Sequence, residues 1–134
     1  MDVGAYEFQA PASVISYAWL QSYGLPTDGS ADYADRDGDT MNNWQEWVAG
    51  TNPTNAASVL RMLSAKPGAT DVVVTWSSVT TRAYSLVRAM NLAAALTFSV
   101  VSSNIAGLAG TTSLIDTNPP AGREAIYRVA VQPP

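Results

Sequence analysis

The sequence predicts an α+β protein, in which a helix-loop-helix around an acidic loop is followed by a small antiparallel β-sandwich. Two stretches within residues 13–50 have apolar residues at helical spacing, and an acidic run lies between them. From residue 57 onward, apolar and polar residues alternate in short runs that Gly, Pro and Asn separate. Hydrophobic residues make up 47% of the 134 residues, which is too many for a disordered polar tail. The chain is therefore long and apolar enough to bury a core.

The first ten residues, MDVGAYEFQA, alternate loosely and predict one short strand. Pro11 separates this strand from the rest of the chain, because proline interrupts regular pairing. We therefore assign residues 1–10 to the terminal strand of an upstream domain or to a linker. Met1 is followed by neither a basic nor an apolar region, so these residues are not expected to form a signal peptide.

Residues 11–56 are predicted to form the helix-loop-helix. Ser13 can cap the first helix, and Gly24 with Pro26 ends it. The second helix begins near Met41 or Asn42 and ends at Gly50. Its apolar residues lie three and four positions apart, at Met41, Trp44, Trp47 and Val48. This spacing predicts that Trp44 and Trp47 pack between the helices, together with Trp19 of the first helix.

Residues 57–134 are predicted to form the β-sandwich. Six candidate strands are residues 59–63, 71–77, 82–88, 97–102, 112–116 and 125–131. Turn-forming residues stand between them, for example Pro67-Gly68 and Pro119-Pro120. Six short strands at this spacing are typical of an antiparallel sandwich.

The acidic loop, residues 35–46, carries the oxygen ligands that calcium prefers. A twelve-residue loop can wrap six to eight oxygen atoms around one calcium ion. Counted from Asp35 as position 1, the ligand positions 3, 5, 7, 9 and 12 fall on Asp37, Asp39, the Met41 carbonyl, Asn43 and Glu46. Position 6 is Thr40 rather than the glycine that the sharp turn favours. The loop therefore predicts a calcium site, and the competing interpretation is an acidic turn that caps the second helix.

A second calcium ion is an alternative that the same region leaves open. A loop that starts at Asp28 would place oxygens at Ser30, Asp32, the Ala34 carbonyl and Asp39. Arg36 would occupy its ninth position, and sharing Asp39 between two ions is demanding. Asn52 could also reach a metal, although a turn that ends the helix explains it more simply.

The run DRDGDTMNNWQEW resembles the calcium loops of bacterial thrombospondin type 3-like repeats and, more loosely, those of dockerins. The resemblance implies calcium ligands at Asp35, Asp37, Asp39, Asn43 and Glu46. Thr40 departs from the glycine of these loops, and this departure concerns the affinity more than the binding itself.

Longer stretches resemble the C-terminal regions of large bacterial surface proteins. These stretches are YGLPTDGSADYADRDGDTMNNWQEWVAGTNPTN, VTWSSVTTRAYSLVRAMNL and the final YRV, while VGAYEFQ is similar to the last strand of parallel β-helix domains. The resemblance implies a secreted or cell-surface bacterial protein with an upstream β-helix and a structural or adhesive role. Calcium would then make the joint between the β-helix and the sandwich rigid.

Catalysis is not expected. The chain has no His and no Cys, so the usual general base, the thiol nucleophile and the imidazole or thiolate metal ligands are excluded. The acids cluster in one loop, whereas glycosidase carboxylates face each other across a cleft. Basic residues are scattered, which does not indicate nucleic-acid binding. No apolar run is long enough to span a membrane.

Two other functions remain alternatives. The sandwich could recognise a glycan through Trp76, Tyr84 or Tyr127, although their alternation with apolar neighbours favours the core. Residues VGAYEFQ could instead add as a strand to the sheet of a neighbouring surface protein.

Overall fold

A computed structural model describes residues 12–89, 97–120 and 125–134 of the chain. Contacts divide the chain into two compact units between Val59 and Leu60. In the described residues, both helices lie in the first unit and all strands lie in the second. The strand predicted for residues 1–10 lies outside the described residues.

The predicted α+β fold class is wrong, because the described residues are mainly β. Helices α2 (Tyr17–Ser22) and α3 (Asn43–Ala49) have only six and seven residues, so the first unit consists largely of turns rather than a helix-loop-helix. Gly24, with a φ of 68°, follows the C-cap Tyr23 of α2, and Gly50 ends α3. Between the helices, Asp28 and Asp35 accept hydrogen bonds from the amides of Ser30 and Gly38, and these bonds stabilise turns rather than helix.

Helix α2 begins one turn later than predicted. Its N-cap is Ser16, whose hydroxyl accepts a hydrogen bond from the Trp19 amide. Ser13 is buried instead, and its hydroxyl donates to Asp32 Oδ1 over 2.6 Å. The small core of this unit contains Ile15, Leu20, Ala31 and Ala49.

Helix α3 turns a polar face inward. Its N-cap Asn42 and the side chain of Gln45 form a reciprocal capping box, and Gly50 ends the helix with a φ of 74°. Its buried residues are Asn43, Glu46 and Ala49. Trp44 is 39% exposed, so the predicted burial of Trp44 between the helices is wrong.

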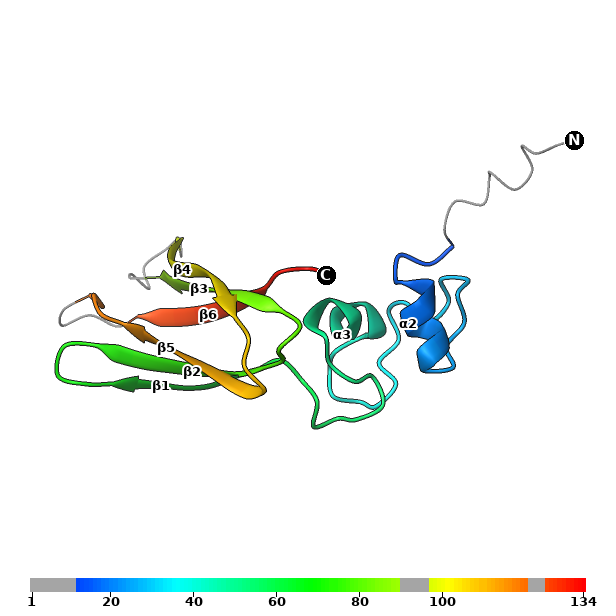
Figure 1. Ribbon diagram of the computed structural model, residues 1–134, viewed down its shortest axis with the longest axis horizontal. Helices are drawn as coiled ribbons and strands as arrows, with labels where there is room; N and C mark the ends of the chain where they lie inside the picture. The colour runs from blue at the N-terminus through cyan, green and yellow to red at the C-terminus, as the bar shows by residue number, and fades with distance from the viewer. Residues whose placement is uncertain (1–11, 90–96, 121–124) are drawn as a thin grey trace, which may run out of the picture. The chain divides into compact units, whose positions relative to one another are not determined.

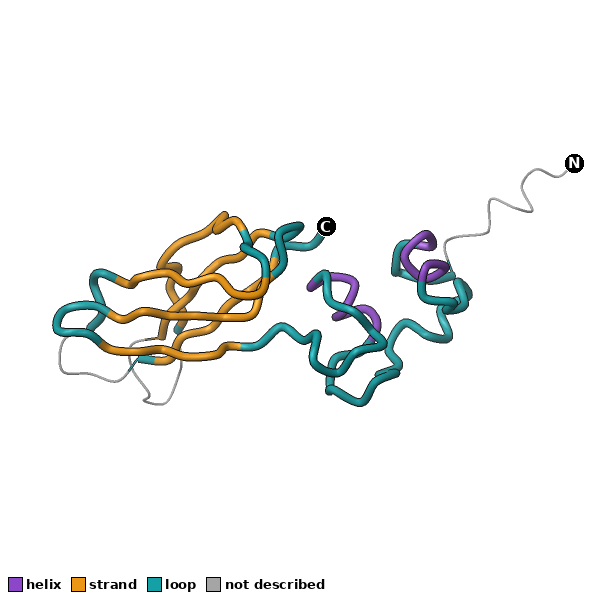
Figure 2. Tube along the Cα trace, turned by 60° about the horizontal axis from the view of Figure 1, so that its bottom comes forward, coloured by secondary structure: helices purple, strands orange, loops and turns teal. Residues whose placement is uncertain are grey.

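The second unit contains two three-stranded antiparallel sheets. The six strands of the described residues are β1 (Met62–Pro67), β2 (Val72–Ser78), β3 (Ala83–Ala89), β4 (Phe98–Ala106), β5 (Gly110–Asp116) and β6 (Ile126–Val131). In one sheet β2 lies between β1 and β5, and in the other β3 lies between β4 and β6 (Figure 1). Figure 2 shows the strands in orange and the loops in teal. The registers pair Trp76 of β2 with Thr112 of β5, and Leu86 of β3 with Val129 of β6.

The core of the second unit lies between its two sheets. Val74 and Trp76 come from β2, whereas Tyr84 and Leu86 come from β3 of the other sheet, and all four are at most 1% exposed. The rings of Trp76 and Tyr84 are tilted against each other with centroids 5.9 Å apart. Alternation along β2 and β3 therefore buries the residues that the sequence pattern placed on one face.

An ion pair and a hydrogen bond also link the two sheets. Arg88 of β3 forms an ion pair with Asp116 of β5, and the Tyr127 hydroxyl of β6 donates to Asp116 Oδ2 over 2.7 Å. Burial opposes the ionisation of Asp116, but these two side chains and the Asn118 amide outweigh it and lower the pKa of this carboxyl. Asp116 therefore remains charged although it is buried.

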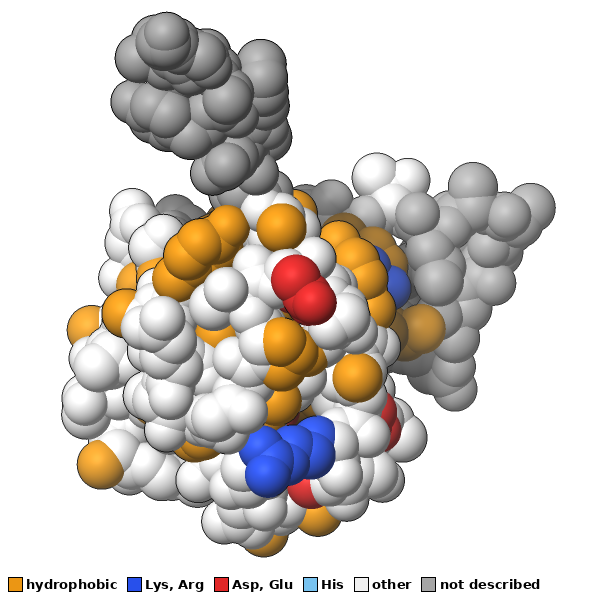
Figure 3. Space-filling model, turned by 90° about the vertical axis from the view of Figure 1, so that its right-hand side faces the viewer, with side chains coloured by type: hydrophobic (Ala, Val, Ile, Leu, Met, Phe, Trp, Pro, Cys, Tyr) orange, Lys and Arg blue, Asp and Glu red, His pale blue; other side chains and the backbone are white. Residues whose placement is uncertain are grey.

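The surface shown in Figure 3 has hydrophobic side chains in small groups among other side chains and backbone atoms. Exposed large apolar residues of the first unit include Val14, Tyr17 and Tyr33. Single exposed apolar residues are normal on protein surfaces. In the described ranges, no helix has the length and apolar character needed to cross a membrane.

Candidate metal centre

The loop before α3 gathers three carboxylates. Oxygen atoms of Asp35, Asp37 and Asp39 lie within 4.8 Å of one another. Asp35 is exposed, and the other two are half-buried. Three carboxylates this close repel each other unless protons or a cation compensate their charge.

Backbone amides fix the orientation of these carboxylates. Asp35 Oδ1 accepts from the amide of Gly38 over 2.7 Å, and Asp35 Oδ2 accepts from the amide of Thr40 over 2.8 Å. Asp37 Oδ1 accepts from the Asp39 amide, and Asp39 Oδ1 accepts from the Met41 amide over 2.8 Å. The loop thus arranges its acids through its own backbone before any ligand binds.

Four side-chain oxygens of this region are buried and, within the described part of the chain, have no hydrogen-bond partner. They are Asp37 Oδ2, Asp39 Oδ2, Asn43 Oδ1 and Glu46 Oε2. Asn43 is 1% exposed and Glu46 is fully buried. A buried oxygen without a partner is costly, and such groups in folded proteins usually meet water or an ion. All four belong to residues that the sequence pattern predicted as calcium ligands.

In each of the two buried polar side chains of α3, only one of the two terminal polar atoms has a hydrogen-bond partner among the described residues. Asn43 Nδ2 donates to the Ala31 carbonyl over 2.8 Å, which leaves Asn43 Oδ1 without a partner. Glu46 Oε1 accepts from the Thr51 hydroxyl, which leaves Glu46 Oε2 without a partner. Both residues therefore keep one oxygen available for a ligand.

The acids of the site influence each other electrostatically. Burial, together with repulsion from Asp39, Asp37 and Asp35, raises the pKa of Glu46 to about 7, against a weaker opposing effect of its hydrogen bond with Thr51. Burial and repulsion from Asp39 and Asp35 also raise the pKa of Asp37. The amide of Thr40 acts in the opposite direction and lowers the pKa of Asp35. A divalent cation among these groups would favour their charged forms.

Met41 lies between the acids and α3, at position 7 of the loop. Its amide donates to Asp39 Oδ1, and the residue is half-buried. This places its main chain next to the carboxylates.

Asp28, Asp32 and Glu46 do not join Asp35, Asp37 and Asp39 in the group of carboxylates that lie within 4.8 Å of one another. Asp28 Oδ1 accepts from both the amide and the hydroxyl of Ser30. Asp32 is buried, and its two oxygens accept from the Ser13 hydroxyl and the Val14 amide. In this arrangement Asp32 anchors the segment before α2, and both of its oxygens already have partners.

Sequence reasoning missed two groups of the site, Thr51 and the Ala31 carbonyl. Thr51 follows Gly50, and sequence reasoning considered its neighbour Asn52 instead. Asn52 is engaged in a turn, because its Oδ1 accepts from the amide and hydroxyl of Thr54. A hydroxyl five residues after Glu46, just past the glycine that ends the helix, was the only signal in the sequence for Thr51.

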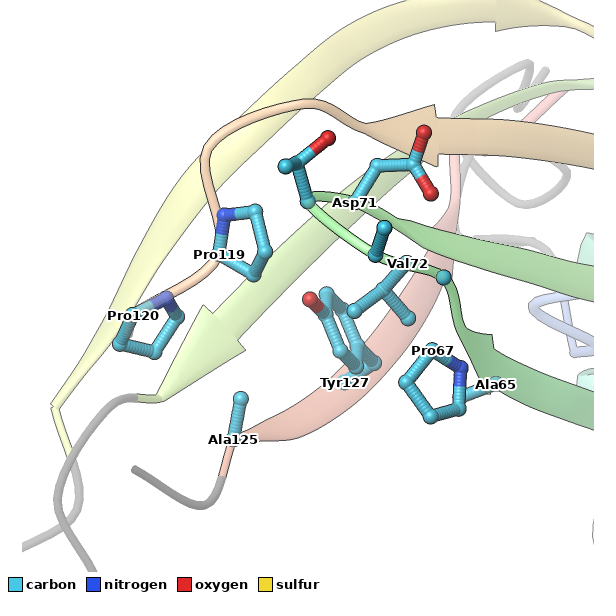
Figure 4. Close-up of a pocket in the computed structure, with 11 residues that line it drawn as sticks. Ala65, Pro67, Asp71, Val72, Pro119, Pro120, Ala125 and Tyr127 are labelled. Atoms are coloured by element: carbon cyan, nitrogen blue, oxygen red, sulfur yellow. The ribbon is translucent and has the colours of Figure 1, made fainter. Parts of the chain in front are cut away.

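A separate cavity of about 600 Å³ lies in the second unit. Its lining includes Pro67, Asp71, Val72, Pro119 and Tyr127, and Figure 4 shows the Tyr127 ring in the midst of this lining. The Tyr127 hydroxyl is engaged with Asp116, so the ring is the part of this side chain that a ligand could contact. The other two aromatic residues considered for glycan recognition, Trp76 and Tyr84, are buried in the core.

No family model matches the chain, and no curated protein or solved structure matches it either.

Proposed function

We propose that the loop of residues 35–46 binds one calcium ion and that this ion stabilises the first unit. The ligands would be side-chain oxygens of Asp35, Asp37, Asp39, Asn43 and Glu46 together with the Met41 carbonyl. The observation that carries the proposal is the set of four buried oxygens without partners, all on these residues. A hard cation with six to eight oxygen ligands suits such a set.

Calcium has a structural role in this proposal. Three adjacent carboxylates and the buried Glu46 repel each other in the metal-free chain, and binding converts this repulsion into attraction. Because the unfolded chain does not hold these oxygens together, binding favours the folded state. The chain is then a non-catalytic, calcium-stabilised module. In line with its sequence resemblance, it would belong to an exported bacterial surface protein and follow a β-helix.

Calcium titration of the full chain tests this proposal. Calorimetry should detect one bound ion, and the melting temperature should rise by several degrees when calcium replaces a chelator. A concentration of about 100 times the dissociation constant contributes roughly 2.7 kcal/mol to the free energy of unfolding. An unchanged melting curve would show that calcium has no structural role.

Two matched variants identify the site. Glu46→Gln should abolish most of the calcium-dependent shift and raise the metal-free melting temperature, because it removes a buried charge that its neighbours repel. Asp28→Asn should keep the full shift, since Asp28 lies outside the cluster and an amide oxygen can still accept from Ser30. Equal effects of the two variants would argue against this location.

A further inference from the structure

We propose that Thr51 determines the ion specificity of this site. Because of Thr51, the site binds Mg²⁺ nearly as well as Ca²⁺. The inference rests on the proposed metal site and adds a residue outside the twelve-residue loop. The Thr51 hydroxyl donates to Glu46 Oε1. Glu46 therefore presents one carboxylate oxygen to an ion rather than two.

Thr51 is attached to Glu46 at two points. Its amide donates to the Glu46 carbonyl over 3.0 Å, in the turn where Gly50 ends α3. Its hydroxyl then reaches the Glu46 side chain, which is fully buried and cannot turn toward solvent. The backbone bond thus fixes the position from which the hydroxyl acts.

The remaining oxygen of Glu46 is the one without a partner. Glu46 Oε2 is buried and has no hydrogen-bond partner among the described residues. Asn43, 1% exposed, also has a buried oxygen without a partner on the same helix. Two nearly inaccessible side chains therefore support the metal site independently of the acidic cluster itself.

One oxygen instead of two from Glu46 changes which ions fit. Calcium accepts six to eight oxygens and commonly takes a bidentate glutamate at the last loop position, whereas magnesium requires six in a near-octahedral arrangement. With one oxygen from each of Asp35, Asp37, Asp39, Met41, Asn43 and Glu46, the site offers six ligands. A bidentate Glu46 would offer a seventh, which only calcium can use.

Calorimetric titrations of the full chain with Ca²⁺ and with Mg²⁺ test this inference. Thr51→Val keeps the size of the side chain and removes the hydroxyl, which releases Glu46 Oε1. We expect the affinity for Ca²⁺ to rise by about tenfold, equivalent to about 1.4 kcal/mol, while the affinity for Mg²⁺ does not rise. Thr51→Ala should change the ratio of the two affinities in the same direction, and it can be used if valine prevents folding.

Two control variants complete the experiment. Thr51→Ser keeps a hydroxyl and should retain the wild-type ratio of affinities. Thr54→Val removes a hydroxyl that donates to Asn52 in the same turn and should leave both affinities unchanged. If Thr51→Val and Thr51→Ala still bind Ca²⁺ with an unchanged ratio of Ca²⁺ to Mg²⁺ affinity, the proposed role of Thr51 is wrong, whereas the proposed metal site is not affected. If the wild-type chain binds neither ion, the proposed metal site itself is wrong.

Discussion

Thr40 occupies the sixth loop position with a φ of 80°, a backbone conformation that glycine adopts easily and β-branched residues rarely do. The same conformation lets the Thr40 amide donate to Asp35 Oδ2 over 2.8 Å. The geometry of the first carboxylate therefore depends on a strained residue. Such strain persists only where the surrounding structure enforces it, and it is frequent at ligand sites.

We predict that Thr40→Gly stabilises the protein. A non-glycine residue in this region costs about 1–3 kcal/mol, and glycine loses up to about 1 kcal/mol through the greater freedom of the unfolded chain. The free energy of unfolding in urea should therefore rise by about 1 kcal/mol, both with calcium and with a chelator. Thr54→Gly serves as the control and should destabilise, because Thr54 is not among the residues with a positive φ. If both variants lose a similar amount of free energy of unfolding, Thr40 is not strained.

At the scale of single elements, α3 shows why the cluster of three carboxylates was easier to predict than the buried face of the helix that follows it. The spacing of Asp35, Asp37 and Asp39 predicts a cluster because a short turn brings such side chains together wherever the rest of the chain lies. The apolar spacing of Trp44 and Trp47 predicts the wrong buried face, because Asn43 and Glu46 take that place. The hydrogen bond from Asn43 to Ala31 comes from a distant turn that no local pattern reveals.

The strands and the two helices were all predicted near their observed positions, and the error lies in the α+β class. Alternation along a strand reports directly which side chains face the core, and the six strands of the described residues lie within four residues of their predicted bounds. The α+β class is wrong because helical spacing says nothing about competing turns at Asp and Asn. The role of Thr51 depends on the three-dimensional turn after Gly50 and could not be read from spacing.

The contacts of Arg88 and Tyr127 with Asp116, which link the two sheets, predict that the protein loses stability at high and at low pH. Burial, with the hydrogen bond to Asp116 and the charge of Asp116, raises the pKa of Tyr127 from 10.0 to about 12. The stability that this contributes is present below pH 10 and is lost as the pH rises through about 12. The pKa of Asp116 is lowered from 3.8, so its contribution is present above pH 3.8 and is lost as the pH falls below that value.

We therefore expect one tyrosine to ionise late in an alkaline titration followed by the ultraviolet absorbance of tyrosinate. Tyr127→Phe should remove this late step and weaken the loss of stability between pH 10 and 12. Tyr33→Phe, which changes a 68% exposed tyrosine, should leave the late step in place. A late step that persists in Tyr127→Phe would show that another tyrosine is responsible.

At the scale of the whole molecule, the two units differ in what holds them together. The second unit has a continuous apolar core between its sheets, formed by Val74, Trp76, Tyr84 and Leu86. The first unit has short helices, many side-chain-capped turns and a buried glutamate. Acidic and basic residues are also unequally divided, since five of the eleven acids fall within residues 28–39. The proposed ion would therefore compensate charge in the first unit rather than in the second.

This difference predicts where calcium acts. All proposed ligands and Thr51 belong to the first unit, whereas the core of the second unit consists of residues from its own strands. Binding slows the exchange of backbone amides with solvent only where opening requires loss of the ion. In hydrogen-exchange mass spectrometry of the full chain, calcium should therefore slow exchange in residues 12–59 and leave β1 to β6 unchanged. Glu46→Gln should remove most of this difference between calcium and a chelator. Equal protection across the strands would instead mean that the two units open together as one cooperative structure.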